Sequence, residues 1–385
     1  MRAAVVEQYG PPEVVTVRDI PAPQPRGNEL LIRVRAATVS SGDARIRALR
    51  MPSPAFRILA LAALGWRGPR RAVLGSDFAG DVVAIGPAVR SFRVGDAVVG
   101  STESSFGTHA ELVCIPESAS VLKKPDTLAY ADAASLIFGS VTASQFLLET
   151  AQLTAGQRIA IIGASGAVGI AAVQIAACHG AHVTAVCSAR NAQRMTSLGA
   201  QEVIDYTTQD FTRSKPFDVI FDTVGATTFS QAAGALTPRG IFLPAVMTMT
   251  EVRQVVFASL TGSRRIRSRV AMARRTDIER IMNWATSQAD FEPLSTAHIP
   301  LKASVTPIVE STAVTKWAAS SSRHKPGSPR AWHVTRQSGS PISAQVIARR
   351  APKKENVLGG SRTCNLRLRR PTLYPIELRA QAMRV

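Results

Sequence analysis

The sequence predicts an α/β fold in which a β-rich N-terminal domain precedes a doubly wound parallel sheet. Apolar residues make up 45% of the 385-residue chain and aromatic residues only 5%, which is more typical of an α/β protein than of an all-β sandwich. Residues 1–125 consist mainly of short apolar runs separated by Gly and Pro, the pattern of strands. From about residue 126, expected strands alternate with expected helices at the spacing of parallel βαβ units.

Within the first 125 residues, two stretches interrupt the strand pattern. The expected strands and turn cover residues 30–34, 81–85 and 94–98. Residues 44–50 predict a helix, and residues 51–71 form an apolar insert flanked by Pro and Arg. Its most apolar part, residues 58–66, is too short to span a bilayer. We therefore expect a buried or substrate-lining helix there.

The second half of the chain predicts alternating strands and helices. The expected strands cover residues 158–162, 183–187, 202–204, 219–222 and 240–244, and the expected helices cover residues 130–148, 168–179 and 192–198. Such alternation predicts a parallel sheet with helices between consecutive strands. After about residue 290 the periodicity is lost.

A glycine-rich turn is the strongest chemical signal in the sequence. It follows the strand at 158–162 and opens the next helix. The expected diphosphate-binding residues are Gly163, Ala164, Ser165, Gly166, Ala167 and Val168. Glycine permits a tight turn and a close approach of the backbone to a diphosphate, and a helix N-terminus offers free N–H groups. The alternative is a close helix–strand crossing without a ligand.

The end of the second parallel strand bears on which dinucleotide binds. NAD enzymes commonly place Asp or Glu there for the ribose hydroxyls. Here the strand is followed by Ser188, Ala189 and Arg190. A hydroxyl and a guanidinium suit a 2′-phosphate, so NADPH is favoured over NADH, although Arg190 could also be an ordinary solvated side chain.

Many short motifs, in order, resemble the medium-chain dehydrogenase/reductase superfamily, in its zinc-independent quinone oxidoreductase-like branch. The resemblance covers residues 1 to about 290. Its motifs are MRAAVV at 1–6, GPPEV at 10–14, AATVSSGD at 36–43, LGSDFAG at 74–80, FRVGD at 92–96, GSVTA at 139–143, the glycine turn, LGA at 198–200, VIDY at 203–206 and DTVG at 222–225.

The resemblance implies a domain plan and further site residues. A GroES-like catalytic domain is expected over 1–125, a Rossmann NADP-binding domain over 126–265, the start of a return to the catalytic domain over 266–295, and an aberrant basic tail over 296–385. The cofactor-binding set is extended by Asp43, Thr142, Tyr206, Val224 and the loop from 242 to 246. Ser40 and Ser41 are expected to face the cleft beside Asp43.

The resemblance also implies that zinc is absent. Zinc-dependent relatives place a Cys ligand near Ser40 and a His-Glu pair near Ser76 and Asp77, whereas this chain has neither there. Zinc in proteins favours Cys and His ligands. We expect no metal, and we expect His109, His179 and His182 to be surface or packing residues.

Together these features predict NADPH-dependent reduction of a quinone or an α,β-unsaturated carbonyl by hydride transfer. Ser40 or Ser41 would hydrogen-bond the developing enolate, or would only satisfy backbone groups at a turn. The alternatives are an alcohol dehydrogenase-like relative and a cofactor-binding but inactive protein with a truncated catalytic domain. We expect a small-molecule carbonyl or quinone as partner, no nucleic acid, no membrane, a possible homodimer and a cytoplasmic location, since no disulfide framework is visible.

The C-terminal stretch differs from the rest of the chain in charge and periodicity. Residues 291–385 hold 16 Lys and Arg against 4 Asp and Glu. The family's closing His-Lys-Val-Gly phrase is absent, but codons compatible with 314–318 encode it in a shifted frame. Residues 361–379 look like a translated antisense transfer-RNA gene. We therefore expect out-of-frame or read-through sequence after about 290–300. The alternative is a basic arm that binds nucleic acid.

Overall fold

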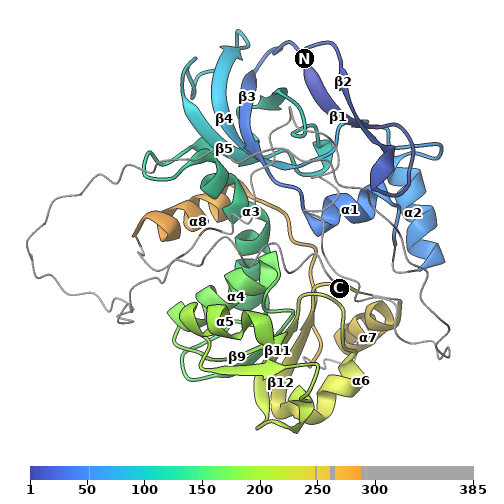
Figure 1. Cartoon of the computed structure of the whole chain (residues 1–385), viewed down its shortest axis with the longest axis vertical. Coiled ribbons are helices and arrows are strands. Elements are labelled where there is room, and N and C mark those ends of the chain that lie inside the picture. Colours follow the sequence, from blue (N-terminus) through green and yellow to red (C-terminus); the bar gives the residue numbers. More distant parts are fainter. Residues whose placement is uncertain (52, 248, 261–264, 288–290, 292, 294–385) are drawn as a thin grey trace, which may run out of the picture. The chain divides into compact units, whose positions relative to one another are not determined.

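The structure is a computed structural model (Figure 1) that describes residues 1–293 apart from 52, 248, 261–264, 288–290 and 292. All described residues belong to the first of the chain's two compact units, Met1–Ala318. The expected aberrant tail at 296–385 lies outside the described residues, as does the end of the expected return segment.

The N-terminal region contains two antiparallel sheets. One is the pair β1 (Arg2–Val6) and β2 (Val15–Asp19). The other has the order β6-β3-β4-β5-β7, formed by β3 (Glu29–Ala37), β4 (Asp77–Ile85), β5 (Ala97–Ser101), β6 (Leu112–Pro116) and β7 (Ser120–Lys123). Alternate residues of these strands, such as Leu30 and Ile32, are fully buried in one apolar cluster with Phe78. The expected β-rich domain is confirmed.

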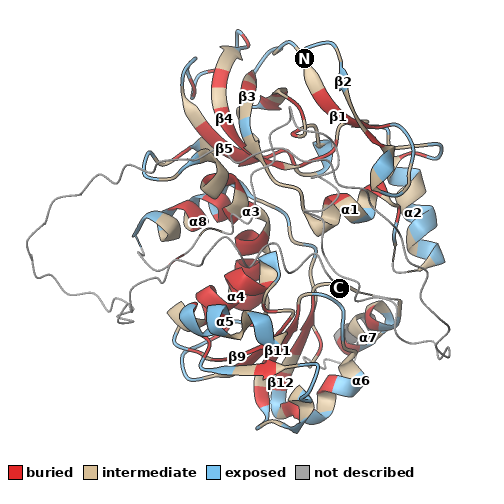
Figure 2. Ribbon diagram, viewed as in Figure 1, coloured by how far each residue is buried: buried red, intermediate tan, exposed pale blue. Residues whose placement is uncertain are grey.

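Two helices follow β3, and their starts are explained by local sequence. Helix α1 (Ser41–Arg47) begins at a capping box, and α2 (Pro54–Leu64) begins at Ser53 with Pro at its first position. Both arrangements satisfy or remove the unpaired N–H groups of a first turn. Helix α2 has no buried residue. The expectation was a buried or substrate-lining helix. Its first alternative is wrong, because the fold covers only one side of this helix (Figure 2), and the substrate-lining alternative stays a prediction.

The second half forms a five-stranded parallel sheet with the order β10-β9-β8-β11-β12. Its strands are β8 (Arg158–Ile162), β9 (His182–Cys187), β10 (Glu202–Asp205), β11 (Phe217–Asp222) and β12 (Leu236–Pro244). The helices between consecutive strands are α4 (Ala167–Cys178), α5 (Ala192–Ser197) and α6 (Phe229–Ala232), and α7 (Met249–Leu260) follows the last strand. This order is that of a doubly wound sheet, which confirms the predicted fold class.

Short 3-10 turns complete the connections between these elements. They are η1 (Pro12–Val14), η2 (Glu103–Ser105), η4 (Ala189–Asn191), η5 (Phe211–Arg213) and η6 (Ala233–Ala235).

The helix α3 (Tyr130–Ser144) joins the two halves. It continues as one π-helical stretch, η3 (Gln145–Thr150), and packs against α4, β4 and β5. In the part of the chain that the structure describes, only this helix is long and apolar enough to cross a membrane, judged by length and composition. Most of it is buried among core side chains such as Leu136, Ile137 and Phe146. A core helix of this kind is apolar because protein surrounds it.

Helix α8 (Arg275–Ser287) packs against α3 and β7 and is held there by a buried polar network. Asp277 has no exposed surface, and its carboxylate accepts hydrogen bonds from Gln145 Nε2 at 2.6 Å and Arg274 Nε at 2.6 Å. Burial by itself would raise the pKa of Asp277. The hydrogen bonds from Arg274 and Gln145 and the charges of Arg274 and Arg280 outweigh it and lower the pKa.

The Asp277 network predicts a pH-dependent contribution to stability. Because its pKa is lower in the folded protein, the contribution is complete above the unfolded value of about 4 and is lost as the pH falls through the folded value. We expect Asp277→Asn to lower the free energy of unfolding by about 1 to 3 kcal/mol at pH 7, since Gln145 and Arg274 lose a buried acceptor. Thermal melts from pH 7 to pH 3 measure this.

The control is Asp210→Asn, because the Asp210 carboxylate is exposed and serves its own turn through Thr212. It should change the melting temperature little. An equal loss in both variants, or an Asp277→Asn deficit that persists unchanged at pH 3, would contradict the assignment.

Candidate functional site

The parallel sheet reverses its order between β8 and β11. The strand β9 follows β8 on one side of it, whereas β11 lies on the other, with Asp222 paired to Ile162 at the carboxyl ends. The loops that leave two such strands diverge, so a crevice opens outside their ends, where ligands of doubly wound sheets bind. The glycine-rich turn begins at this point.

Two glycines of the turn are required by close packing. Gly163 has a φ of +75°, and a Cβ there would meet Val224 Cγ1 at 2.6 Å. A Cβ on Gly169 would lie 2.2 Å from the carbonyl oxygen of Gly163. Gly166 differs, because a Cβ there would meet only the Gly163 oxygen, at 3.4 Å. Packing explains Gly163 and Gly169, whereas Gly166 is not required by protein contacts.

The N-terminus of α4 lacks a side-chain cap. Gly166 is its N-cap residue, and the first helical residues are Ala167 and Val168. The first N–H groups of a helix have no partner within it and carry partial positive charge. Gly166 and Ala167 are exposed, so this helix start can receive an anion.

A buried carboxylate shapes the opposite side of the crevice. Asp222 has no exposed surface, and it accepts hydrogen bonds from the N–H groups of Val224 at 3.0 Å, Gly225 at 2.8 Å and Thr227 at 2.8 Å. Burial raises the pKa of Asp222, and the loop amides oppose that shift. Because its carboxylate holds three amides of one loop, the loop after β11 is fixed beside Gly163, with Val224 43% exposed.

The carboxyl ends of β9 and β10 place three further predicted residues on one edge. Ser188 follows β9, its hydroxyl accepts from Asn191, and Arg190 is exposed. Tyr206 follows β10, and its N–H donates to the Cys187 carbonyl. Asp205 lies beside this edge, but its carboxylate is used by the Thr207 turn, whose hydrogen bonds lower its pKa. No carboxylate follows β9 directly.

Ser40 and Asp43 form the capping box of α1. The Ser40 hydroxyl donates to Asp43 Oδ2 at 2.7 Å and accepts from the Asp43 N–H at 3.2 Å. The Ser40 N–H also donates to the Asp43 carboxylate. Its hydroxyl proton is therefore committed to a structural contact, whereas the Ser41 hydroxyl has no protein partner within the described residues.

The predicted nicotinamide-side residues are divided between a helix and a strand. Thr142 lies on α3, where its hydroxyl donates to the Phe138 carbonyl at 2.8 Å. Residues 242–244 do not form a loop as expected. They complete β12, where Phe242 is fully buried, and only Ala245 and Val246 continue past it. The strand ends at Pro244, as the predicted strand at 240–244 does, but it begins earlier, at Leu236, which pairs with Phe217 of β11.

A cluster of polar residues beside Thr38 was not predicted from the sequence. Asp77 is almost fully buried and lies within hydrogen-bonding reach of Thr38 and Ser101. Burial raises the pKa of Asp77 to about 7, against the hydrogen bond from Ser101. His109 Nε2 lies 2.8 Å from the Thr38 carbonyl oxygen. These residues come from four separate segments, so no local motif could have indicated the cluster.

Within residues 1–293, as far as the structure describes them, no three His, Cys, Asp or Glu side chains are grouped so that they could hold a metal ion. The described donor set near Ser40 and Asp77 consists of hydroxyl and carboxyl oxygens and the His109 imidazole, without a thiol.

Comparison with known proteins matches two family models to this chain. "Alcohol dehydrogenase GroES-like domain" matches residues 26–126, and "Zinc-binding dehydrogenase" matches residues 167–288. The first match covers the antiparallel sheet described above, and the second covers most of the parallel sheet.

Several curated proteins are similar to parts of the chain. The mitochondrial NAD(P)H oxidoreductase RTN4IP1 of Bos taurus is 34% identical over 59% of this chain and 60% of its own length. The chloroplastic quinone-oxidoreductase homolog of Spinacia oleracea is 36% identical over 50% of this chain and 56% of its own length. A quinone oxidoreductase of Pseudomonas aeruginosa is 30% identical over 61% of this chain and 70% of its own length. The chain thus spans less than two thirds of the first two relatives.

A solved structure extends the similarity over more of the chain. The quinone oxidoreductase from Coxiella burnetii aligns with a TM-score of 0.70 and 27% identity, covering 82% of this chain and 96% of its own. The two family models and these relatives together show that this chain belongs to the medium-chain dehydrogenase/reductase superfamily, in its quinone oxidoreductase-like branch.

Proposed function

We propose that this protein is an NADPH-dependent oxidoreductase that reduces a quinone or an α,β-unsaturated carbonyl without zinc. The observation that carries the proposal is the start of α4, which is exposed and has no side-chain cap. It lies at the Gly163–Gly169 turn, where the strand order of the sheet reverses. The curated relatives named NAD(P)H oxidoreductase and quinone oxidoreductase support it.

The turn fits a dinucleotide diphosphate. Gly166 leaves open the space that a Cβ would fill. Bare backbone there, together with the N–H groups at the start of α4, suits close approach of an anionic group. Val224 lies against Gly163 and would border the same crevice.

Ser188 and Arg190 support NADPH rather than NADH. A carboxylate after β9 would repel a 2′-phosphate, and none is present there. Within the described residues Arg190 has no ion-pair partner, so its guanidinium can meet a phosphate. Tyr206 lies at the end of the neighbouring strand and would complete this side.

The residues near α1 suit a reaction that needs no strong Lewis acid. NADPH would supply a hydride, and reduction of a conjugated carbonyl then requires alignment, a dry pocket and a hydrogen-bond donor. Ser40 already donates to Asp43, so Ser41 is the more available hydroxyl for a developing enolate. The described donors near Asp77 include the His109 imidazole but no thiolate, and zinc sites of this family type favour a Cys ligand.

The proposal includes a small-molecule carbonyl or quinone substrate, a possible homodimer and a cytoplasmic location. Relatives carry mitochondrial and chloroplastic names, and these locations are not transferred. An alcohol dehydrogenase-like activity is the alternative reaction for the same site.

The first prediction from the proposed function concerns the reaction. The purified full chain should oxidise NADPH when given a water-soluble benzoquinone or a simple enone, and added chelator should leave the rate unchanged. The measurement is loss of absorbance at the nicotinamide band. NADPH binding without turnover on either substrate would favour the inactive, cofactor-binding alternative.

The second prediction concerns Gly166. The change Gly166→Ala should leave the melting temperature nearly unchanged, because its Cβ meets only one protein atom at 3.4 Å. It should weaken NADPH binding at least about tenfold, since the methyl group occupies the space expected for the diphosphate. Fluorescence titration measures the affinity.

The matched control for Gly166→Ala is Gly234→Ala, where a Cβ meets nothing within 4 Å. The affinity of Gly234→Ala for NADPH should equal that of the unmodified protein. Equal affinity in both variants would place the diphosphate elsewhere and remove the main support for the proposal.

The third prediction concerns cofactor choice. The change Arg190→Ala should weaken NADPH binding by roughly tenfold while leaving NADH binding within about twofold, because only NADPH carries the 2′-phosphate. The control is Arg194→Ala, an exposed arginine on α5. If Arg190→Ala weakened the binding of NADPH and NADH equally, the guanidinium would not be the group that binds the 2′-phosphate.

A further inference from the structure

The outward face of α2 is apolar and exposed. Its side chains Ile58 and Leu59 are 62% and 64% exposed, and Trp66, just past the end of the helix, is 73% exposed. Ala55 and Ala62 lie on the same face and are also exposed. A helix with this surface normally has a partner, because apolar area left in water costs free energy.

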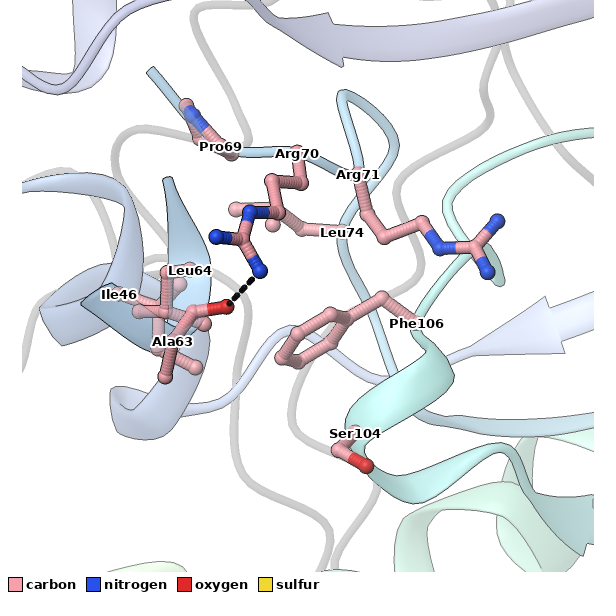
Figure 3. A pocket seen from close by; sticks show the side chains of 9 residues that line it. All are labelled: Ile46, Ala63, Leu64, Pro69, Arg70, Arg71, Leu74, Ser104 and Phe106. Carbon is pink, nitrogen blue, oxygen red and sulfur yellow. Dashed lines mark hydrogen bonds between the residues drawn. The ribbon is translucent and has the colours of Figure 1, made fainter. Parts of the chain in front are cut away.

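The inward face of α2 borders a cavity. Ala63 and Leu64 line a cavity of about 180 Å³ together with Ile46 of α1 and Phe106. Figure 3 shows the Arg70 guanidinium reaching back across this cavity to the Ala63 carbonyl oxygen. The helix is thus apolar on both sides, and its inward contacts do not account for its outward side chains.

The charge of the segment that carries the exposed face is of one sign. Residues 44–76 hold seven arginines and no Asp, Glu or Lys. Arg57 on the helix and Arg67 just past its end are exposed, whereas Arg70 and Arg71 line the inward cavity. Arginines flanking an apolar helical face with an adjacent Trp match the chemistry of a surface carrying anionic headgroups over hydrocarbon.

We propose that α2 docks this protein onto an anionic lipid surface, with Ile58, Leu59 and Trp66 entering the headgroup boundary and Arg57 and Arg67 contacting lipid phosphates. An 11-residue helix is about 16 Å long, which suits a helix lying in the interface. Residues 58–66 are too short to span a bilayer, but a helix that lies in the interface does not need to span it. The inference does not depend on the proposed reaction, and it replaces the expectation of no membrane partner.

A second copy of this chain is a poorer occupant. Symmetrical pairing through α2 would bring two exposed arginine groups together with no acidic residue in 44–76 to neutralise them. Like charges at an interface disfavour association. A lipid surface instead supplies the complementary charge and the apolar layer together.

The first test is partition of full-length variants onto vesicles of phosphatidylcholine with phosphatidylserine, at physiological salt. The double change Ile58→Asp with Leu59→Asp should lower the partition coefficient at least about tenfold, because it removes apolar insertion and adds repulsion. Arg57→Gln should lower it by roughly fivefold. The basic sequence at 296–385 is identical in every variant, so its contribution cancels.

The matched controls lie on the turn between β4 and β5. Val94 is 62% exposed, and its neighbour Arg93 is also exposed. Val94→Asp and Arg93→Gln alter the same kinds of residue away from α2, and each should change partition less than the corresponding α2 variant. Circular dichroism melts should show all variants folded.

The second test measures the contact of Trp66 with lipid by fluorescence quenching. Phosphatidylcholine brominated on its acyl chains should quench part of the tryptophan emission of the full chain, and Trp66→Phe should lose that quenched part. Three outcomes overturn the proposal. They are equal partition of the Ile58/Leu59 and Val94 variants, unchanged quenching in Trp66→Phe, and an α2-dependent dimer in sedimentation without vesicle binding.

Discussion

The close contact between Gly169 and the backbone of Gly163 is the constraint on which the parallel half of the structure depends. A Cβ at Gly169 would lie 2.2 Å from the Gly163 oxygen, so α4 can approach β8 only because this position has no side chain. That approach brings the uncapped start of α4 to the sheet's reversal point. The same backbone atoms therefore determine both the helix–sheet packing and the shape of the crevice.

Asp222 gives the opposite wall of the crevice comparable rigidity. Its buried carboxylate holds the amides of Val224, Gly225 and Thr227, and the Thr223 hydroxyl donates to the Ile162 carbonyl at 2.8 Å. Burying a carboxyl group is costly unless its hydrogen bonds are satisfied. The loop after β11 supplies those hydrogen bonds. The Asp222 carboxylate therefore fixes the loop, and the loop in turn stabilises the buried carboxylate.

The predictable parts of the site were those encoded by neighbouring residues. The strand at 158–162, the glycine turn and the start of the next helix are local, and β8 matches the predicted strand residue for residue. The partners of Asp77 come from segments up to 39 residues away, as its contact with Thr38 shows, so spacing could not reveal them. Of the two alternatives for 58–66, a buried or a substrate-lining helix, burial failed because composition reports how apolar a helix is, and not how many of its sides the fold covers.

The capping box at α1 shows how the structure divides roles between adjacent serines that the sequence left equivalent. Ser40 has the extended backbone of an N-cap residue and exchanges hydrogen bonds with Asp43, whereas Ser41 is the first helical residue, with its hydroxyl uncommitted. A hydroxyl that already donates to a carboxylate must lose that bond before it can donate to a substrate, which costs free energy. Ser40 therefore acts by positioning the helix start, and through it Ser41, where the proposed substrate oxygen would lie.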